Sequence, residues 1–249
     1  MTMQSVPQIF SRKRRAARRA RHLALRAADP QAQFLRAHMA AEIVDRLDFM
    51  QLTPALALVL DDAPDPLADL LAQRGSAIAD MPLPDEELPY PRGGFDLIAS
   101  LAQLDTVNDL PGALIHARAA LAPGGLFIAC LCGAGSLPSL RQILMVADGE
   151  RPAARIHPQI DNLAASGLMG RAGFSRQVVD SHSLTVSYRS LERMLADLRA
   201  QGLTNVLADS PPPLTREAMA RARAAFAEMA DSEGRVTETF EILTLTGWR

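Results

Sequence analysis

Residues 95–131 read FDLIASLAQLDTVNDLPGALIHARAALAPGGLFIACL, and this stretch decides the fold of the chain. Its two short apolar runs, 95–100 and 126–131, are typical of buried parallel strands. Between them a helix is predicted over 109–121, with Asp109 as its N-cap and a Pro-Gly-Gly turn after its end. A strand, a helix and a second strand in this order predict a parallel sheet covered by helices on both faces.

The same alternation extends on both sides of this stretch. Further strands are predicted at 55–60, 76–79, 176–180, 184–188 and 239–248, and further helices at 31–50, 66–74, 136–148, 162–171, 190–200 and 215–230. The arrangement predicts an open, mostly parallel α/β sheet of seven strands. The ligand crevice of such a sheet lies outside the carboxyl ends of its strands.

Length and composition indicate a globular protein. The chain has 249 residues, of which 48% are hydrophobic and 22% charged, and these values exclude a chain disordered throughout, a fibrous repeat and a disulfide scaffold. No run approaches the ~20 apolar residues of a membrane span. We expect a basic N-terminal arm and helical extension over 1–50 and a main domain over 51–249, with a candidate inserted lobe at about 149–235. Cys130 and Cys132 are expected to be buried free thiols.

Charge is unevenly distributed along the chain. Residues 1–28 contain eight basic residues and no acidic one, although the formal net charge of the whole chain is −2. The arm is predicted to be helical. It is either a solvated, arginine-covered helix or a segment that contacts an acidic partner, a membrane surface or RNA. Because no aromatic residues are interleaved with the arginines, base stacking is disfavoured and nucleic acid is not an expected partner.

Several motifs carry a resemblance to a known family. The 95–131 stretch, with its APGG turn before an apolar strand, resembles the fourth strand, following helix and fifth strand of class I S-adenosylmethionine-dependent methyltransferases. Narrower matches are VNDLPGAL at 107–114, GSLPSLR at 135–141, GRAGF at 170–174, VVDSHSLTVSY at 178–188, ETFEILTLTGW at 238–248, PQIFSRKRRAARRAR at 7–21 and LRAQGLTNVL at 198–207. Together they resemble the methyltransferase-like family of mitochondrial complex I assembly factor 5 and its bacterial relatives.

The resemblance implies a Rossmann-like class I methyltransferase fold and an S-adenosylmethionine site. It also implies a protein client, with a respiratory complex I subunit as the candidate, and chemistry that is either methylation or hydroxylation of a protein arginine. An arginine-rich, acid-free N-terminus also resembles an organelle transit peptide, but the family resemblance extends into the arm and argues that the arm is retained. The implied location is the cytoplasm for a bacterial chain and the mitochondrial matrix for a eukaryotic one.

The cofactor loop departs from the family pattern. When the D-x-G-x-G-x-G motif is aligned on residues 57–71, its acid falls on Val59 and its glycines fall on Asp61, Ala63 and Asp65. Carboxylates there lie where the cofactor's own carboxylate binds, and like charges at ~4 Å repel by about 1 kcal/mol in water and about 4 kcal/mol at an intermediate dielectric. Two other roles stay open for Asp61 and Asp62. They could cap the helix at 66–74, or they could bind the cofactor's ammonium group.

The remaining candidates follow from the same alignment. Asp80 is the candidate for the ribose hydroxyls, and Asp85 replaces the adenine-side acid with a shift of one residue. The cofactor-side candidates are therefore Asp61, Asp62, Asp80, Asp85 and Leu101. On the substrate or partner side the candidates are Asp105, Asn108 and Ser136, in segments where a family His-Trp pair and a family acid are missing. No catalytic residue is identified, and the five histidines show no paired metal spacing, so no metal site is expected.

Two functions remain open from the sequence. One is an S-adenosylmethionine-dependent methyltransferase-like protein that acts on, or assembles, a respiratory-complex subunit. The other is a catalytically inactive protein of the same fold that holds a client or partner without cofactor, through the crevice or the lobe.

Overall fold

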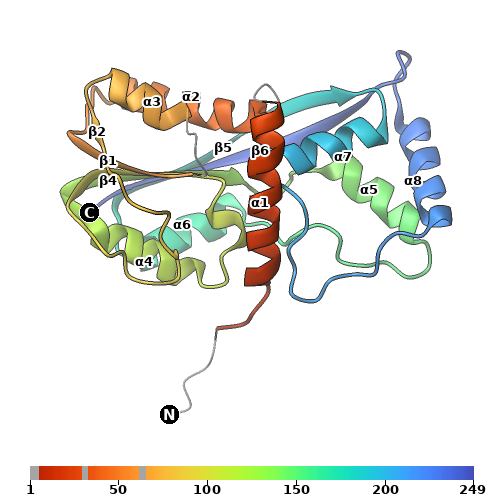
Figure 1. The fold of residues 1–249 in the computed structure, drawn as a ribbon, viewed down its shortest axis with the longest axis horizontal. Helices are drawn as coiled ribbons and strands as arrows, with labels where there is room; N and C mark the ends of the chain where they lie inside the picture. The colour runs from red at the N-terminus through yellow and green to blue at the C-terminus, as the bar shows by residue number, and fades with distance from the viewer. Residues whose placement is uncertain (1–5, 30–32, 62–65) are drawn as a thin grey trace, which may run out of the picture.

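The computed structural model describes residues 6–29, 33–61 and 66–249, and its centre is one mixed sheet (Figure 1). The strands are β1 (Leu56–Leu60), β2 (Ala77–Ile78), β3 (Phe95–Leu101), β4 (Leu121–Cys132), β5 (Ser175–Tyr188) and β6 (Val236–Trp248). Their order across the sheet is β2-β1-β3-β4-β6-β5. The first four strands in this order run parallel, whereas β6 pairs antiparallel with both β4 and β5. The predicted α/β class and mostly parallel core are confirmed.

Helices cover both faces of the sheet, as the nearly continuous burial of β3 and of the second half of β4 requires. They are α1 (Arg12–Ala28), α2 (Phe34–Phe49), α3 (Pro66–Gln73), α4 (Leu110–Ala120), α5 (Pro138–Asp148), α6 (Asn162–Arg171), α7 (Leu191–Ala200) and α8 (Arg216–Met229). Apolar residues of α2 and α3 pack on one face in the same core as α5, α7 and α8. Those of α4 and α6 pack on the other face. Figure 1 shows the two layers, with α2 and α3 on one side of the sheet and α4 and α6 on the other.

The predicted count of seven strands is wrong for the part of the chain that the structure describes, where the sheet has six. The predicted strands at 176–180 and 184–188 are halves of the single strand β5. Ser181, His182 and Ser183, which separate them in the sequence, remain paired with residues of β6. Backbone hydrogen bonds to a long antiparallel partner hold these polar residues in the strand, because one face of such a ribbon can stay exposed to water.

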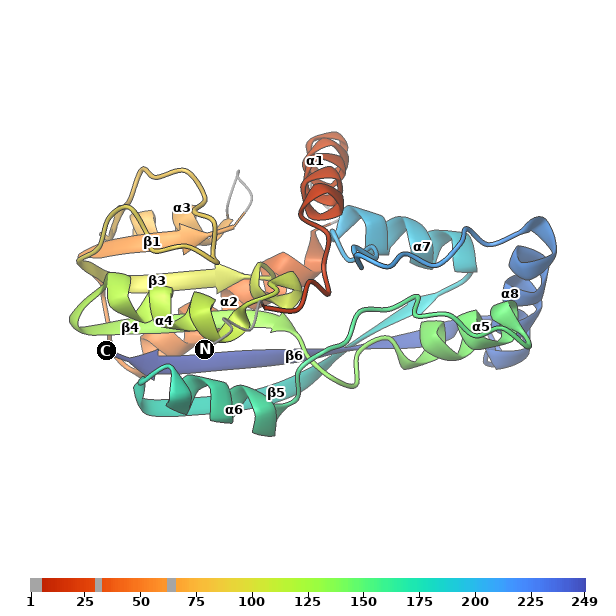
Figure 2. The ribbon, with the colours of Figure 1, turned by 90° about the horizontal axis from the view of Figure 1, so that it is seen from below.

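β5 and β6 extend well beyond the parallel strands, and α5, α7 and α8 gather around their far half (Figure 2). α5 contacts β6 and α8, whereas α7 contacts β5 and α8. α6 lies within the predicted lobe of 149–235, yet it packs on the main sheet beside α4. No helix of the described residues is long and apolar enough to cross a membrane.

Local chemistry explains where α4 begins and how the chain then enters β4. The carboxylate of Asp109 accepts a hydrogen bond from the Gly112 amide at 2.9 Å, which confirms Asp109 as the N-cap. Near the start of β4, where its pairing with β3 shifts register, Gly124 has φ +75°, a conformation that favours glycine. A Cβ on the next residue, Gly125, would lie 2.7 Å from the carbonyl oxygen of Phe95. The second glycine therefore lets β4 approach β3 closely.

This close approach predicts opposite effects for two glycine substitutions. Gly125→Ala should lower the free energy of unfolding by about 1–3 kcal/mol, because backbone atoms must move to admit the methyl group. Gly167→Ala is the matched control, because Gly167 lies in α6 with no atom within 4 Å of an added Cβ. It should raise stability by about 0.5–1 kcal/mol. Urea denaturation of both variants measures the difference, and equal effects would contradict the packing argument.

Candidate functional site

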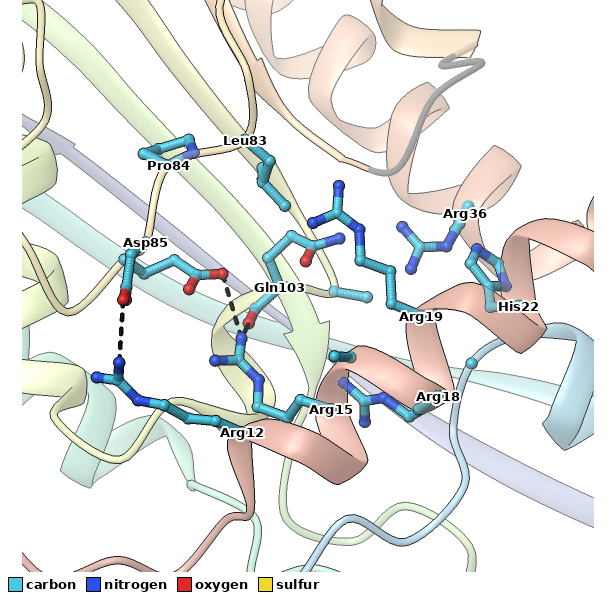
Figure 3. Close-up of a pocket in the computed structure, with 14 residues that line it drawn as sticks. Arg12, Arg15, Arg18, Arg19, His22, Arg36, Leu83, Pro84, Asp85 and Gln103 are labelled. Carbon is cyan, nitrogen blue, oxygen red and sulfur yellow. Dashed lines mark hydrogen bonds and ion pairs between the residues drawn. The ribbon is translucent and has the colours of Figure 1, made fainter.

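A cavity lies where the parallel strands end, as expected for an open α/β sheet. Its volume is about 330 Å³, and it is lined by one face of α1, by Arg36 of α2 and by the segments 83–86 and 102–103. α1 lies across the carboxyl ends of these strands, beside α7 (Figure 2). Arg12, Arg15, Arg18 and Arg19 of α1 line the cavity (Figure 3). The crevice that the sequence predicts is therefore present, and its wall is arginine-rich.

A buried ion pair holds Arg36, which lines this crevice. Asp61 directly follows β1, and its fully buried carboxylate accepts a hydrogen bond from the Nη1 atom of Arg36. The same Nη1 atom donates to the carbonyl oxygen of Leu101 at 3.2 Å, at the end of β3. Arg26 of α1 adds a second cation, with its Nη1 atom 3.9 Å from the Asp61 carboxylate. One guanidinium group thus joins α2 to the ends of two neighbouring strands.

The other cofactor-side candidates are only partly brought together. Asp85 lines the cavity, but its carboxylate faces α1 and lies 3.3 Å from the Nη1 atom of Arg12. Asp80 follows β2, is exposed to solvent and is not among the residues lining the cavity. Leu101 is buried and contributes its carbonyl oxygen. Asp62 lies outside the described residues.

Further ion pairs hold α1 in place over the crevice. Arg12 pairs with Glu87 at 2.7 Å and Arg15 pairs with Glu86 at 3.2 Å (Figure 3 draws Arg12 and Arg15). Burial raises the pKa of Glu86, and the positive charge of Arg15 opposes that rise. Burial also acts to raise the pKa of Glu87, but hydrogen bonds from Arg12 and from a backbone amide lower it overall. The acidic partner of the arginine-rich arm is, on this face, the chain's own segment 85–87.

The substrate-side candidates have different surroundings. Asp105 lies 3.8 Å from the Nη1 atom of Arg18 and lines a second cavity. Asn108 makes two hydrogen bonds to the backbone of Phe10, accepting at 2.8 Å and donating at 3.1 Å, so it anchors the arm. Ser136 is buried and exchanges hydrogen bonds with the backbone of Glu241. Asp105 lines this second cavity, whereas the hydrogen bonds of Asn108 and Ser136 go to the chain's own backbone.

The second cavity has a volume of about 170 Å³ and lies between α5, α7 and the loop at 155–159. Its apolar lining consists of Leu137, Leu140, Leu144, Ile156, Leu195, Leu198 and Leu203. Burial lowers the pKa of His157, at its edge, to about 4. The neutral ring accepts a hydrogen bond at its Nε2 atom from the Val206 amide at 2.8 Å. Arg155 makes a multidentate ion pair with Asp148 and is held in place.

Sequence reasoning missed the arginines of α1 as residues of the crevice. A signal was present, because Arg12, Arg15 and Arg18 recur at the three-residue spacing that places side chains on one helix face. The run Asp85–Glu87 supplied the complementary charge. The side chains of Arg155 and His157 gave no such signal, since their role depends on a loop whose path the sequence does not specify.

Comparison with known proteins identifies relatives that share this architecture. No family model matches the chain. The chain is 31% identical over 221 residues to the protein named arginine-hydroxylase NDUFAF5, mitochondrial, of Danio rerio, a match covering 85% of this chain and 64% of that protein. It is 35% identical over 188 residues to the rat protein of the same name, and this match covers 72% of this chain and 54% of the rat protein. A malonyl-[acyl-carrier protein] O-methyltransferase of Halorhodospira halophila is 32% identical over 165 residues, and this match covers 65% of this chain and 54% of that protein.

Among solved structures, the YcgJ protein of Bacillus subtilis superposes with a TM-score of 0.50 at 10% identity, covering 86% of this chain and 98% of that one. The chain belongs to the class I methyltransferase-fold family. It spans between about half and two thirds of the length of these curated relatives. The Rossmann-like fold implied by the sequence motifs is confirmed.

The family implies S-adenosylmethionine as a cofactor, and the described residues of the crevice can be compared with what binding of this cofactor requires. Asp61 is buried outside the cavity lining, and it already neutralises Arg36, a lining cation that the cofactor's carboxylate would otherwise meet. The candidate for the ribose hydroxyls, Asp80, lies outside the cavity lining, and Asp85 is engaged by Arg12. These residues do not fit the cofactor, although a cavity remains in its place.

The buried pair predicts a large difference between two similar substitutions. Asp61→Asn should lower the free energy of unfolding by about 3–5 kcal/mol, because it leaves the Arg36 charge buried without its partner. Asp85→Asn is the control, because its partner Arg12 is 62% exposed, and it should cost about 0–1 kcal/mol. The double variant Arg36→Met with Asp61→Leu should regain most of the loss. Guanidinium denaturation measures all three, and equal losses for the two single variants would contradict the assignment.

Proposed function

We propose that this chain is a methyltransferase-fold protein that holds a protein client without S-adenosylmethionine. The observation that supports this proposal best is the buried Asp61–Arg36 pair beside the crevice. An internal carboxylate there satisfies the cation that a bound carboxylate would otherwise meet. Opening the pair to admit a cofactor would cost several kcal/mol, which a ligand must recover before it binds.

The client side of the proposal rests on the second cavity and on the relatives. Most of the cavity wall is aliphatic, so it suits an apolar segment of a client. The relatives named arginine-hydroxylase NDUFAF5 belong, by the resemblance described above, to a family that assembles respiratory complex I. The proposed client is therefore a respiratory complex I subunit. The proposed compartment is the cytoplasm for a bacterial chain and the mitochondrial matrix for a eukaryotic one.

A second function, S-adenosylmethionine-dependent methylation, is favoured by one observation. A cavity of about 330 Å³ persists at the carboxyl ends of the parallel strands, where enzymes of this fold bind their ligand. Binding there would require the Asp-rich loop to accept the cofactor's ammonium group. Direct measurement of cofactor binding separates the two functions.

Isothermal titration calorimetry with S-adenosylmethionine should detect no binding to the wild-type chain at protein concentrations of tens of micromolar. Asp61→Gly should gain measurable affinity, because it frees Arg36 for the cofactor's carboxylate. Asp209→Gly is the matched control, since Asp209 lies exposed in a loop, and it should bind no better than the wild type. Circular dichroism verifies that each variant is folded. Micromolar binding by the wild type would refute the proposal and favour the methyltransferase.

A second test addresses the client. In a cell whose own copy is deleted, wild type should restore assembled complex I, as measured by native gels and NADH oxidation. Leu144→Arg, which places a charge in the second cavity, should restore at most a tenth of that level. Met145→Arg, the next residue of the same helix and 62% exposed, should restore it fully. Full restoration by Leu144→Arg would contradict the role of this cavity.

A further inference from the structure

The size and lining of the second cavity limit what it can take from a client. Its volume is about 170 Å³, and most of its wall consists of leucine and isoleucine side chains. A dry protein cavity of about 150 Å³ with a similar aliphatic and aromatic lining holds one benzene ring, so the second cavity has room for about six carbon atoms. This is the size of one large aliphatic or aromatic side chain.

One polar atom in the lining lacks a hydrogen bond. Gln159 lines the cavity, and its Oε1 atom is buried with no partner among residues 6–29, 33–61 and 66–249. A buried acceptor without a donor is destabilising, so a ligand that brings an N–H group gains affinity there. The backbone amides of a peptide supply such donors, whereas a plain acyl chain has none. The lining therefore favours a peptide segment.

The positive charge near this cavity exceeds the negative charge. Arg155 is neutralised by Asp148, and Asp105 is paired with Arg18. These two ion pairs cancel, so they leave no net charge for a ligand to meet.

Two further guanidinium groups are not cancelled in this way. Arg199, exposed at the end of α7, lines the cavity. Arg14 of α1 donates from its Nη2 atom to the carbonyl oxygen of Asn205, another lining residue, at 3.2 Å. Neither arginine forms an ion pair within the part of the chain that the structure describes. A carboxylate complements such groups, because hydrogen bonds between guanidinium and carboxylate are charge-assisted.

We propose that the second cavity recognises a client segment in which one large apolar side chain lies next to an aspartate or glutamate. This inference rests on the proposed holding of a client and adds the chemistry of the segment that is held. The apolar side chain fills the aliphatic cavity, and a backbone N–H group of the segment donates to Gln159. The neighbouring carboxylate binds Arg199, and the charge of Arg14 adds to the attraction.

Two matched dipeptides test the proposal on the untagged full chain, with dissociation constants measured by NMR titration. N-acetyl-leucyl-glutamate with an amidated C-terminus should bind at least about threefold more tightly than the corresponding leucyl-lysine peptide, the size of effect expected for one exposed ion pair. Arg199→Gln should remove this preference. Arg193→Gln is the control and should keep it, because Arg193 is 64% exposed on the same helix and is not among the lining residues.

Hexanoate, which has the carboxylate and the apolar chain but no N–H group, tests the role of Gln159. Gln159→Leu should weaken binding of the acidic dipeptide and leave binding of hexanoate unchanged. Equal binding of the two dipeptides overturns the proposed charge preference, and so does a preference that survives Arg199→Gln. Hexanoate binding as tight as that of the acidic dipeptide overturns the assignment to a peptide. Failure of the acidic dipeptide to bind at millimolar concentration overturns the proposal as a whole.

The complementation experiment separates this inference from the proposed function. Arg199→Glu should restore at most about a third of the assembled complex I, because it repels an acidic segment, whereas Arg193→Glu should restore it fully. If Leu144→Arg abolishes assembly and Arg199→Glu restores it, the holding of a client stands and the acidic segment is wrong. If Leu144→Arg restores assembly and the dipeptides bind with the expected preference, the ligand class stands and the proposed function is wrong.

Discussion

The ion pair between Asp61 and Arg36 is the constraint on which the arrangement of the crevice depends. It forms in the dry interior at the end of β1, and the same guanidinium group reaches the last carbonyl of β3. Two buried charges are tolerated there only because each satisfies the other. The pair thus fixes α2 against the sheet, and it also neutralises a cation that lines the crevice. Stability and the proposed exclusion of the cofactor therefore have the same physical source.

The arginine-rich arm is the second element that depends on charge. Its eight basic residues look like a surface for an external acidic partner when the sequence is read alone. In the folded chain, Arg12, Arg15 and Arg18 pair with Asp85, Glu86, Glu87 and Asp105, so one face of α1 is neutralised from within. The buried or half-buried pairs position the helix, whereas the exposed Arg12 pairs contribute little to stability. Lys13 and Arg21 remain exposed on the outer face.

The second cavity lies next to the crevice, because Gln103 and Gly202 line the crevice while their near neighbours Asp105 and Leu203 line the second cavity. β5 and β6 extend beyond the parallel strands and give α5, α7 and α8 a platform of their own (Figure 2). The second cavity opens between two of these helices, and Asp105 joins it to the arginines of α1. A segment bound there would contact the crevice without needing a ligand inside it. The proposed client binding depends on this arrangement of the second cavity beside the crevice.

The sequence by itself determined the α/β class, the central strand-helix-strand unit, the cap at Asp109 and the departure of the cofactor loop from glycine. These features depend on short-range patterns, such as apolar runs, turn residues and spacing within one motif. The tertiary structure alone decided that 176–188 is one strand, that Asp61 pairs with Arg36, that Asn108 bonds to the backbone of the arm, and that His38 meets His182. Each of these depends on which segments, up to 144 residues apart, come into contact. A local sequence pattern does not specify which distant segment it will contact, because burial and charge pairing arise only when the two segments pack together.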